Sequence, residues 1–320
     1  MCRTYNGADI NVEPGNNPQL KDGRGNIAPA TIILPTVAME ADRDVEKFMS
    51  LLDKYIHDTK NELLERFKLI CSQSADSAKF MWENGTMFGY KKEEGPISAL
   101  KHGTLVIGQL GLAECLELLI NTDQTTEKGM ALAERIESLF YTRCKEFKQQ
   151  YHLNFGVYFT PAENLCYTAM TKFKNKYGII PKVSDRDYFT NSIHVPVWKE
   201  MTPFEKIDIE SQLTGYSNAG CITYVELDSS VINNIDALET IVDYAMEHDI
   251  PYFAINVPAD RCKDCGYQGE ISGKCPNCGS NNINRLRRVT GYLTGNYTTA
   301  FNPGKQSEVK DRVKHIKVIK

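Results

Sequence analysis

Long hydrophobic runs and an excess of charge of one sign are both missing from this sequence. No stretch of its 320 residues reaches the roughly 18 consecutive apolar residues of a membrane-spanning helix, so we expect no membrane protein. The start, Met1 to Gly7, lacks the charged and then apolar layout of a secretory signal, and we expect a cytoplasmic protein. The 37 Lys and Arg residues nearly balance the 41 Asp and Glu residues, which argues against a dedicated nucleic-acid-binding protein.

The hydrophobic pattern changes its period along the chain, without any fixed internal repeat. Residues 1–30, rich in Gly, Asn, Asp and Pro, predict a loop. Strands that alternate with long helices imply an α/β fold with largely parallel strands. The composition shifts to Cys, Gly, Asn and basic residues after Val257, where we place a boundary. The expected strands are 31–35, 155–159, 221–227 and 251–257, and the expected helices are 42–71, 113–119, 125–150, 160–177 and 236–248.

Four of the ten cysteines form two Cys-x-x-Cys pairs, and these predict a metal site. Each pair brings two thiolates to one side of a tight turn, and two such turns supply the four sulfurs of a closed tetrahedral Zn²⁺ shell. Disulfides are the weaker reading because the chain is neither short nor visibly secreted, and iron is the main chemical alternative. A closed shell implies a structural role for the zinc, and the glycine after each pair predicts a positive φ. The residues are Cys262, Cys265, Cys275 and Cys278, followed by Gly266 and Gly279.

A second candidate site follows the expected strand 155–159. Thr160 is a good helix N-cap, Pro161 suits the first helical position, and Glu163 completes a capping box. A helix N-terminus after a strand offers free backbone N–H groups to an anion, although the residues alone favour a plain helix cap over a phosphate site. Gly108 and Gly111 form a weak Gly-x-x-Gly signal, and His194 is more typical of a packed histidine than of a base.

The end of the chain resembles the anaerobic (class III) ribonucleoside-triphosphate reductases. The matching segments are Arg288-Val-Thr-Gly291-Tyr-Leu, Phe301-Asn-Pro-Gly-Lys305 and Glu308 to His315, and the four-cysteine ribbon fits the same family. The resemblance implies that Gly291 carries a stable glycyl radical. Glycine suits this role because a Cα radical is stabilised when it is planar, and a side chain would crowd that arrangement.

The start of the chain is similar to the same family. It has Cys2-Arg3, then Asp22-Gly-Arg-Gly-Asn26, then a strand that ends in Leu34-Pro35. The resemblance implies that Cys2 becomes a thiyl radical. It also implies that Asn26 matches a position where family members that use formate as reductant have an asparagine. It also implies a substrate-phosphate loop formed by Thr160, Pro161, Ala162, Glu163 and Asn164. The stretch from Tyr188 to Pro196 resembles the family without an assignable role.

The resemblance also implies a fold and a division of the chain. We expect the second half of a ten-stranded α/β barrel at residues 1–257, a zinc ribbon at 258–283 and a glycyl radical domain at 284–320. The resemblance covers only the C-terminal half of the family. An N-terminal complementing chain would then supply the first half of the barrel and the regulatory nucleotide-binding region, with ATP binding there. The complete enzyme is expected to be a homodimer, and an inactive fragment is the alternative.

The implied activity is the anaerobic reduction of ribonucleoside triphosphates to deoxyribonucleoside triphosphates for DNA replication. The chain has no Cys-x-x-x-Cys-x-x-Cys, so the radical is expected to come from a partner activase that uses an iron–sulfur cluster and S-adenosylmethionine. Other readings are a zinc-ribbon structural or binding protein with an ordinary Gly291, and a radical spare-part protein. A third alternative is a different glycyl radical enzyme, one that acts on a carboxylate or a diol.

Overall fold

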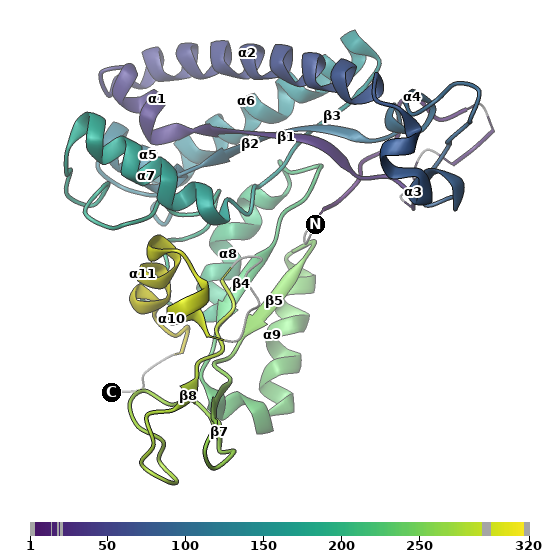
Figure 1. Ribbon diagram of the computed structural model, residues 1–320. Coiled ribbons are helices and arrows are strands. Elements are labelled where there is room, and N and C mark those ends of the chain that lie inside the picture. Colours follow the sequence, from purple (N-terminus) through teal and green to yellow (C-terminus); the bar gives the residue numbers. More distant parts are fainter. Residues whose placement is uncertain (1–3, 14, 18, 20–21, 290–295, 317–320) are drawn as a thin grey trace.

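The computed structural model describes residues 4–13, 15–17, 19, 22–289 and 296–316. Its largest unit is a parallel sheet of three strands in the order β1-β2-β3. The central strand β2 is buried along its whole length, and α2 covers β1 (Figure 1). The strands are β1 (Asn26–Ile33), β2 (Thr104–Leu110) and β3 (Asn154–Val157).

Long helices follow these strands because their apolar residues recur on one face. The stripe on α2 contains Phe48, Leu52, Ile56 and Leu63, all fully buried. Side chains cap the two longest helices: Asp44 accepts from the Lys47 N–H, and Thr126 from the Gly129 N–H. The helices of this unit are α1 (Leu34–Glu40), α2 (Val45–Cys71), α3 (Lys79–Glu83), α4 (Ile97–Leu100), α5 (Leu112–Ile120), α6 (Glu127–Tyr151) and α7 (Glu163–Tyr177), with a 3₁₀ turn η1 (Ala75–Ala78).

A second parallel pair continues the sheet beyond β3. Tyr158 forms a parallel bridge with Gly220, and the Ala219 N–H donates to the Val157 carbonyl at 3.0 Å. The five parallel strands therefore follow one another as two sheets, β1-β2-β3 and then β4-β5, joined through this one bridge. The pair is β4 (Thr223–Glu226) and β5 (Phe253–Asn256), with the helices α8 (Pro203–Thr214) and α9 (Ile235–Glu247) and the 3₁₀ turn η2 (Ser229–Asn233).

The remaining chain forms a small antiparallel ribbon and two helices. The ribbon has the strand order β7-β6-β8 and lies beyond β4 and β5 from the three-stranded sheet (Figure 1). Helix α11 packs on α7, so this helix returns to the unit that contains the main sheet. The elements are β6 (Asp260–Cys262), β7 (Gln268–Gly269), β8 (Ile283–Asn284), α10 (Tyr297–Ala300) and α11 (Pro303–Asp311).

The predicted α/β class with parallel strands is confirmed, whereas one predicted strand has other bounds and two elements are not predicted. The loop predicted at 1–30 is wrong at residues 26–30, which form the first part of β1. The strand expected at 31–35 ends at Ile33, because Pro35 lies in the first turn of α1. The residues before Ala113 form β2, which periodicity cannot reveal because a strand buried on both faces shows no alternation. The helix α8 also escaped prediction, although Thr202 and Glu205 form a complete capping box at its start.

Both ends of the five-strand series carry apolar surface. Within the described residues, β1 pairs only with β2, and β5 only with β4. A groove of about 590 Å³ lined by Thr31, Ile33 and Thr160 follows β1. Next to β5, α9 exposes Ile235 and Met246 at 66% and 70%. None of the helices in the described part of the chain has both the length and the apolar content that a bilayer crossing requires.

A buried carboxyl group lies between α6 and β2. Glu137 is fully buried, and its Oε1 accepts from Gln109 Nε2 at 2.8 Å. Burial raises the pKa of Glu137 to about 8, against the opposing effect of the Gln109 hydrogen bond. The carboxyl group is therefore protonated in the folded protein at neutral pH, whereas it is ionised in the unfolded chain above about pH 4.5.

We expect the free energy of unfolding to depend on this group between about pH 4.5 and 8. A raised pKa in the folded state means that Glu137 contributes less stability as the pH rises through this window, by about 1.4 kcal/mol per pH unit. Glu137→Gln removes that slope and retains the acceptor for Gln109. Chemical denaturation at several pH values should show that the free energy of unfolding of the variant rises relative to that of the wild type as the pH rises. A stability difference that is constant with pH would contradict this assignment.

Candidate functional site

The four cysteines of the ribbon lie close enough together to bind one metal ion. All four Sγ atoms are within 4.8 Å of one another. The Cys262–Cys278 and Cys265–Cys275 sulfurs are 3.6 and 3.5 Å apart. In a tetrahedral site with Zn–S bonds of about 2.3 Å the sulfurs would be about 3.8 Å apart, and in a disulfide about 2.0 Å. The group therefore fits Zn²⁺, and four sulfurs leave no position for a substrate.

The knuckle geometry follows from two glycines in the left-handed region. Gly266 has φ 79° and donates its N–H to the Cys262 carbonyl at 3.1 Å. Gly279 has φ 73° and donates to the Cys275 carbonyl at 2.9 Å. Each turn folds the second cysteine back towards the first, and a Cβ would strain it. The positive φ predicted at both glycines is confirmed.

The turn after β3 differs from the prediction. Helix α7 begins at Glu163, its N-cap is Ala162, and no side chain caps it, so the capping box of Thr160 and Glu163 is wrong. Thr160 instead continues the strand direction, and its Oγ1 lies 3.0 Å from Thr31 Oγ1. The start of α7 therefore has no side-chain cap from Thr160.

Gly108 makes this contact possible. It lies on β2 opposite Thr31 and next to the strand that leads to Thr160. A Cβ at Gly108 would be 2.0 Å from Thr160 Oγ1 and 2.5 Å from the Tyr158 carbonyl oxygen. The missing side chain therefore lets the two threonine hydroxyls meet across the central strand. The weak Gly-x-x-Gly signal marks this stretch as one that faces the substrate, which stays a prediction.

The turn also contacts the segment that follows Gly291 in the sequence. Asn302 Nδ2 donates to Asn164 Oδ1 at 2.7 Å. Gly304 approaches α7 so closely that a Cβ would lie 2.7 Å from the Tyr167 side chain. The Thr160–Asn164 turn and the start of α11 are therefore neighbours although about 140 residues of chain separate them.

Asn26 and the beginning of the described chain meet at one carbonyl group. Asn26 Nδ2 and the Tyr5 N–H both donate to the Ala219 carbonyl, at 3.1 and 3.0 Å. Asn26 Oδ1 is buried and has no hydrogen-bond partner among the described residues. Asn26 therefore lies beside the segment that follows Cys2. Thr31, at the other end of β1, contacts Thr160, so one ligand that reaches both places must be elongated.

Buried polar groups that the sequence analysis missed fix this first segment. His102 Nδ1 lies 2.6 Å from Asp9 Oδ2, and Asn154 Nδ2 donates to Asp9 Oδ1 at 2.8 Å. Burial would raise the pKa of Asp9, but hydrogen bonds from Asn154, the Asn11 N–H and His102 outweigh it and lower the pKa. Asp9 and His102 are 93 residues apart, and no sequence signal joins them.

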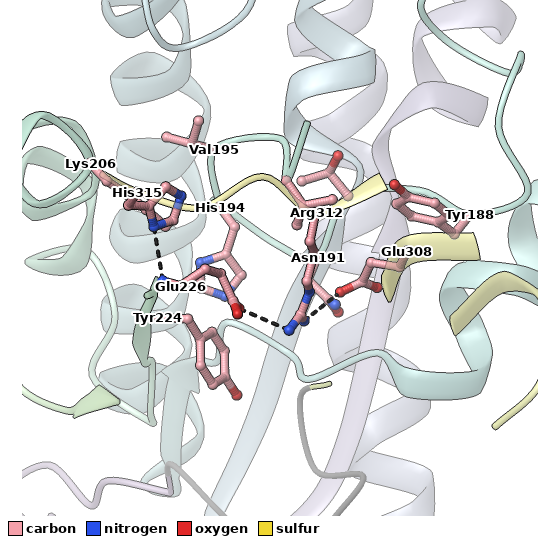
Figure 2. A pocket seen from close by; sticks show the side chains of 12 residues that line it. Tyr188, Asn191, His194, Val195, Lys206, Tyr224, Glu226, Glu308, Arg312 and His315 are labelled. Carbon is pink, nitrogen blue, oxygen red and sulfur yellow. Dashed lines mark hydrogen bonds and ion pairs between the residues drawn. The ribbon is translucent and has the colours of Figure 1, made fainter. Parts of the chain in front are cut away.

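The stretch 188–196, which had no assigned role, receives the end of the chain. It lines an enclosed cavity of about 40 Å³ together with Glu226, Glu308, Arg312 and His315 (Figure 2). Tyr188 donates its hydroxyl to Asp311 at 2.9 Å, and His194 lies 3.3 Å from Glu210, deep in the protein. A cavity of this volume has room for a water molecule or two and is too small for a nucleotide. The burial of His194 beside Glu210 is in keeping with a packed histidine, and its role stays a prediction.

Cys2 and Gly291 lie outside the described residues. The described residues next to them are Thr4 and Tyr5 on one side, and Val289 and Asn296 on the other. The four cysteines form one cluster. Asn26 and the Thr160–Asn164 turn are at opposite ends of the first sheet.

We expect Cys262→Ser to lose the metal. One of two buried sulfur ligands disappears, and the ribbon has little other core to hold it. Elemental analysis should fall from about one zinc per chain towards zero, and the melting temperature should drop. Cys71→Ser, at the end of α2, is the control and should keep its zinc. A Cys262→Ser variant with full zinc content and unchanged melting temperature would contradict the site.

We expect Gly108→Ala to disturb the Thr160 turn. The added methyl group collides with Thr160 Oγ1 and with a backbone oxygen that cannot move freely, which costs about 1–3 kcal/mol. Gly215→Ala is the control, because a Cβ there has nothing within 4 Å. Denaturant unfolding compares the two variants. Equal stability of both would show that the Thr31–Thr160 contact tolerates a side chain at position 108.

Comparison with known proteins places the whole chain in one family. The family profile described as "Anaerobic ribonucleoside-triphosphate reductase" matches residues 1–315. The anaerobic ribonucleoside-triphosphate reductase of Salmonella typhimurium is 33% identical, over 98% of this chain and 45% of its own length. The phage T4 enzyme is 32% identical, over 93% and 50%. The chain thus spans about half the length of the curated relatives it matches.

Solved structures show the same fold. An anaerobic ribonucleotide reductase has a TM-score of 0.77 at 21% identity and covers 92% of this chain and 46% of its own. The Thermotoga maritima enzyme with glycerol in the active site has a TM-score of 0.68 at 20% identity, over 88% and 43%. The profile match over nearly all residues, together with these relatives, establishes that the chain belongs to the anaerobic ribonucleoside-triphosphate reductase family.

Proposed function

We propose that this chain is the radical-carrying half of an enzyme that reduces ribonucleoside triphosphates to deoxyribonucleoside triphosphates without oxygen. The observation that carries the proposal is the family match over residues 1–315, which spans every segment named for the chemistry. The geometry supports it, because Asn26 lies beside Tyr5, in the segment that follows Cys2, and the Thr160–Asn164 turn lies beside the segment after Gly291.

The proposed reaction consumes one formate for each nucleotide. Formate gives up a hydride equivalent and becomes carbon dioxide, a proton is taken up, and the ribose 2′-hydroxyl leaves as water. The sum is ribonucleoside triphosphate, formate and H⁺ to deoxyribonucleoside triphosphate, carbon dioxide and water. Asn26 is the residue proposed to face formate. One hydrogen of its amide group binds the Ala219 carbonyl, and the second remains for an anion.

The radical steps use two residues of this chain. Gly291 stores the unpaired electron on Cα and takes a hydrogen atom from Cys2, so that the radical moves to sulfur. The Cys2 thiyl radical then abstracts the ribose 3′-hydrogen, which weakens the neighbouring 2′-C–O bond. The 3′-hydrogen returns at the end, and Cys2 is a thiyl radical again. The protein contributes positioning and the exclusion of water.

The Thr160–Asn164 turn is proposed to bind the substrate phosphates. Thr160, Pro161, Ala162, Glu163 and Asn164 follow the carboxyl end of β3, where ligands of parallel α/β sheets bind. The start of α7 has no side-chain cap, and the positive end of its helix dipole favours an anion there. The carboxylate of Glu163, in the first turn, stabilises the positive end of the helix dipole, so it competes with a phosphate for this end of α7.

Zinc supplies structure and no chemistry in this proposal. It would be held by Cys262, Cys265, Cys275 and Cys278 and would fix the ribbon between β5 and the chain that leads to Gly291. We infer three parts, namely a barrel half at 1–257, the ribbon at 258–283 and the glycyl radical domain at 284–320.

The other half of the barrel is proposed to come from the part of the family that this chain does not contain. Five parallel strands are half of a ten-stranded barrel, and the outer edges of β1 and β5 offer the hydrogen bonds for its closure. The exposed residues Ile235, Val242 and Met246 lie on one face of α9, which suits burial by that other half. The complete enzyme would be a cytoplasmic homodimer with a separate activase that uses an iron–sulfur cluster and S-adenosylmethionine.

We expect two variants to separate the radical steps. With the N-terminal half and the activase present, Gly291→Ala should give no glycine-centred doublet in electron paramagnetic resonance, because the methyl group opposes planarity at Cα. Cys2→Ser should keep the doublet but form no deoxyribonucleotide, because an alcohol O–H bond is too strong for the transfer. Gly215→Ala is the control for both measurements.

Two results would contradict the proposed function. A doublet that persists in Gly291→Ala would place the radical elsewhere. Deoxyribonucleotide formation by Cys2→Ser would remove Cys2 from the mechanism.

A further inference from the structure

A cluster of alternating charges connects the end of the chain to β4. Its members are Glu226 on β4, Lys305 and Glu308 on α11, and Arg312 just after α11. The side chains of Arg312, Glu226 and Glu308 are 13%, 15% and 6% exposed, and that of Lys305 is fully buried. Two cations balance two carboxylates, as burial of charge requires.

Arg312 is the centre of this cluster (Figure 2). Its Nη1 lies 2.8 Å from Glu226 Oε1, and its Nη2 lies 3.1 Å from Glu308 Oε1. The carboxylates belong to two different elements, so together they fix the plane of the guanidinium group. Lys305 holds the other oxygen of Glu308 at 2.5 Å, so Glu308 in turn cannot rotate freely.

The fixed guanidinium group makes a third contact. Arg312 Nη1 donates to the Arg288 carbonyl oxygen at 2.7 Å. Arg288 precedes Gly291 by three residues in the sequence. On the other side of Gly291, the Tyr297 N–H donates to the Arg285 carbonyl at 3.3 Å. Among the described residues, the Arg312 side chain and the Tyr297–Arg285 backbone bond thus hold the chain on the two sides of Gly291.

The backbone around Arg312 is held independently of its side chain. The Val313 N–H donates to the Val197 carbonyl at 3.0 Å, and the His315 N–H to the Glu226 carbonyl at 2.7 Å. The Glu226 N–H donates in return to His315 Nδ1 at 3.0 Å. A change of the Arg312 side chain therefore removes the Arg288 contact and leaves the tail attached to β4.

We propose that Arg312 is a positioning residue that holds the backbone before Gly291 in place for radical transfer. This inference rests on the proposed function, in which Gly291 must meet both an activase and Cys2. A lysine at position 312 keeps the charge, but its single nitrogen cannot reach Glu226, Glu308 and the Arg288 carbonyl together.

The test compares Arg312→Lys with Arg143→Lys in the complete reductase assembly. Arg143 also binds a carboxylate with two nitrogens, at 2.7 and 3.0 Å to Asp53, but it lies on α6. Hydrogen–deuterium exchange of the peptide 285–297 should speed up about tenfold in Arg312→Lys, which is the effect of losing one charge-assisted hydrogen bond. The ribbon peptide 260–284 and the zinc content should stay unchanged. After activation, the glycyl radical should form in lower yield and decay several times faster.

Glu226→Gln gives a second variant. It removes the charge of the carboxylate that binds Arg312, while the backbone bonds between residue 226 and His315 remain. It should shift the same two readouts in the same direction. Wild-type exchange and radical lifetime in both variants would overturn the inference, as would equal changes in Arg143→Lys. If the wild-type assembly gives no glycine-centred doublet, the proposed function fails, and the exchange measurement still decides whether Arg312 anchors this backbone.

Discussion

The parallel pairing of β2 with both β1 and β3 is the constraint on which the rest of the structure depends. Because β2 is buried along its whole length, each neighbour is fixed in register, and a slip of one residue would exchange the two faces. That register puts Gly108 between Thr31 and Thr160 and sets the direction in which the chain leaves β3. The placement of α7, and through it of α11, follows from this one strand.

Buried polar contacts then attach both ends of the described chain to this frame. Asp9 with His102 and Asn154 fixes the first segment, and Arg312 with Glu226 and Glu308 fixes the last one. Such pairs add little net stability, since desolvation offsets most of the attraction, but loss of one partner is costly. They therefore specify position more than they stabilise the fold, which suits segments proposed to bring Gly291 and Cys2 to one reaction.

The ribbon would be stabilised by a metal ion and not by a hydrophobic core. Its strands are two or three residues long, too short to fold on their own, and four sulfurs around a metal ion would replace the missing core. Arg287 and Asp260 add a buried ion pair at its base, where it joins the chain that leads to Gly291. A rigid local unit of this kind can hold a neighbouring segment without depending on the main hydrophobic core.

The sequence by itself determined the features whose cause is local. Periodicity determined α2 and α6, the spacing of Cys262, Cys265, Cys275 and Cys278 determined the metal cluster, and the motifs around Gly291 and Cys2 indicated the family. Only the tertiary structure decided that the Thr160 hydroxyl meets Thr31 rather than capping α7, and that Arg312 binds the Arg288 carbonyl and Glu226. The partners of Thr160 and Glu226 are 129 and 86 residues away, and contacts at such distances depend on strand register and packing, which no local pattern encodes.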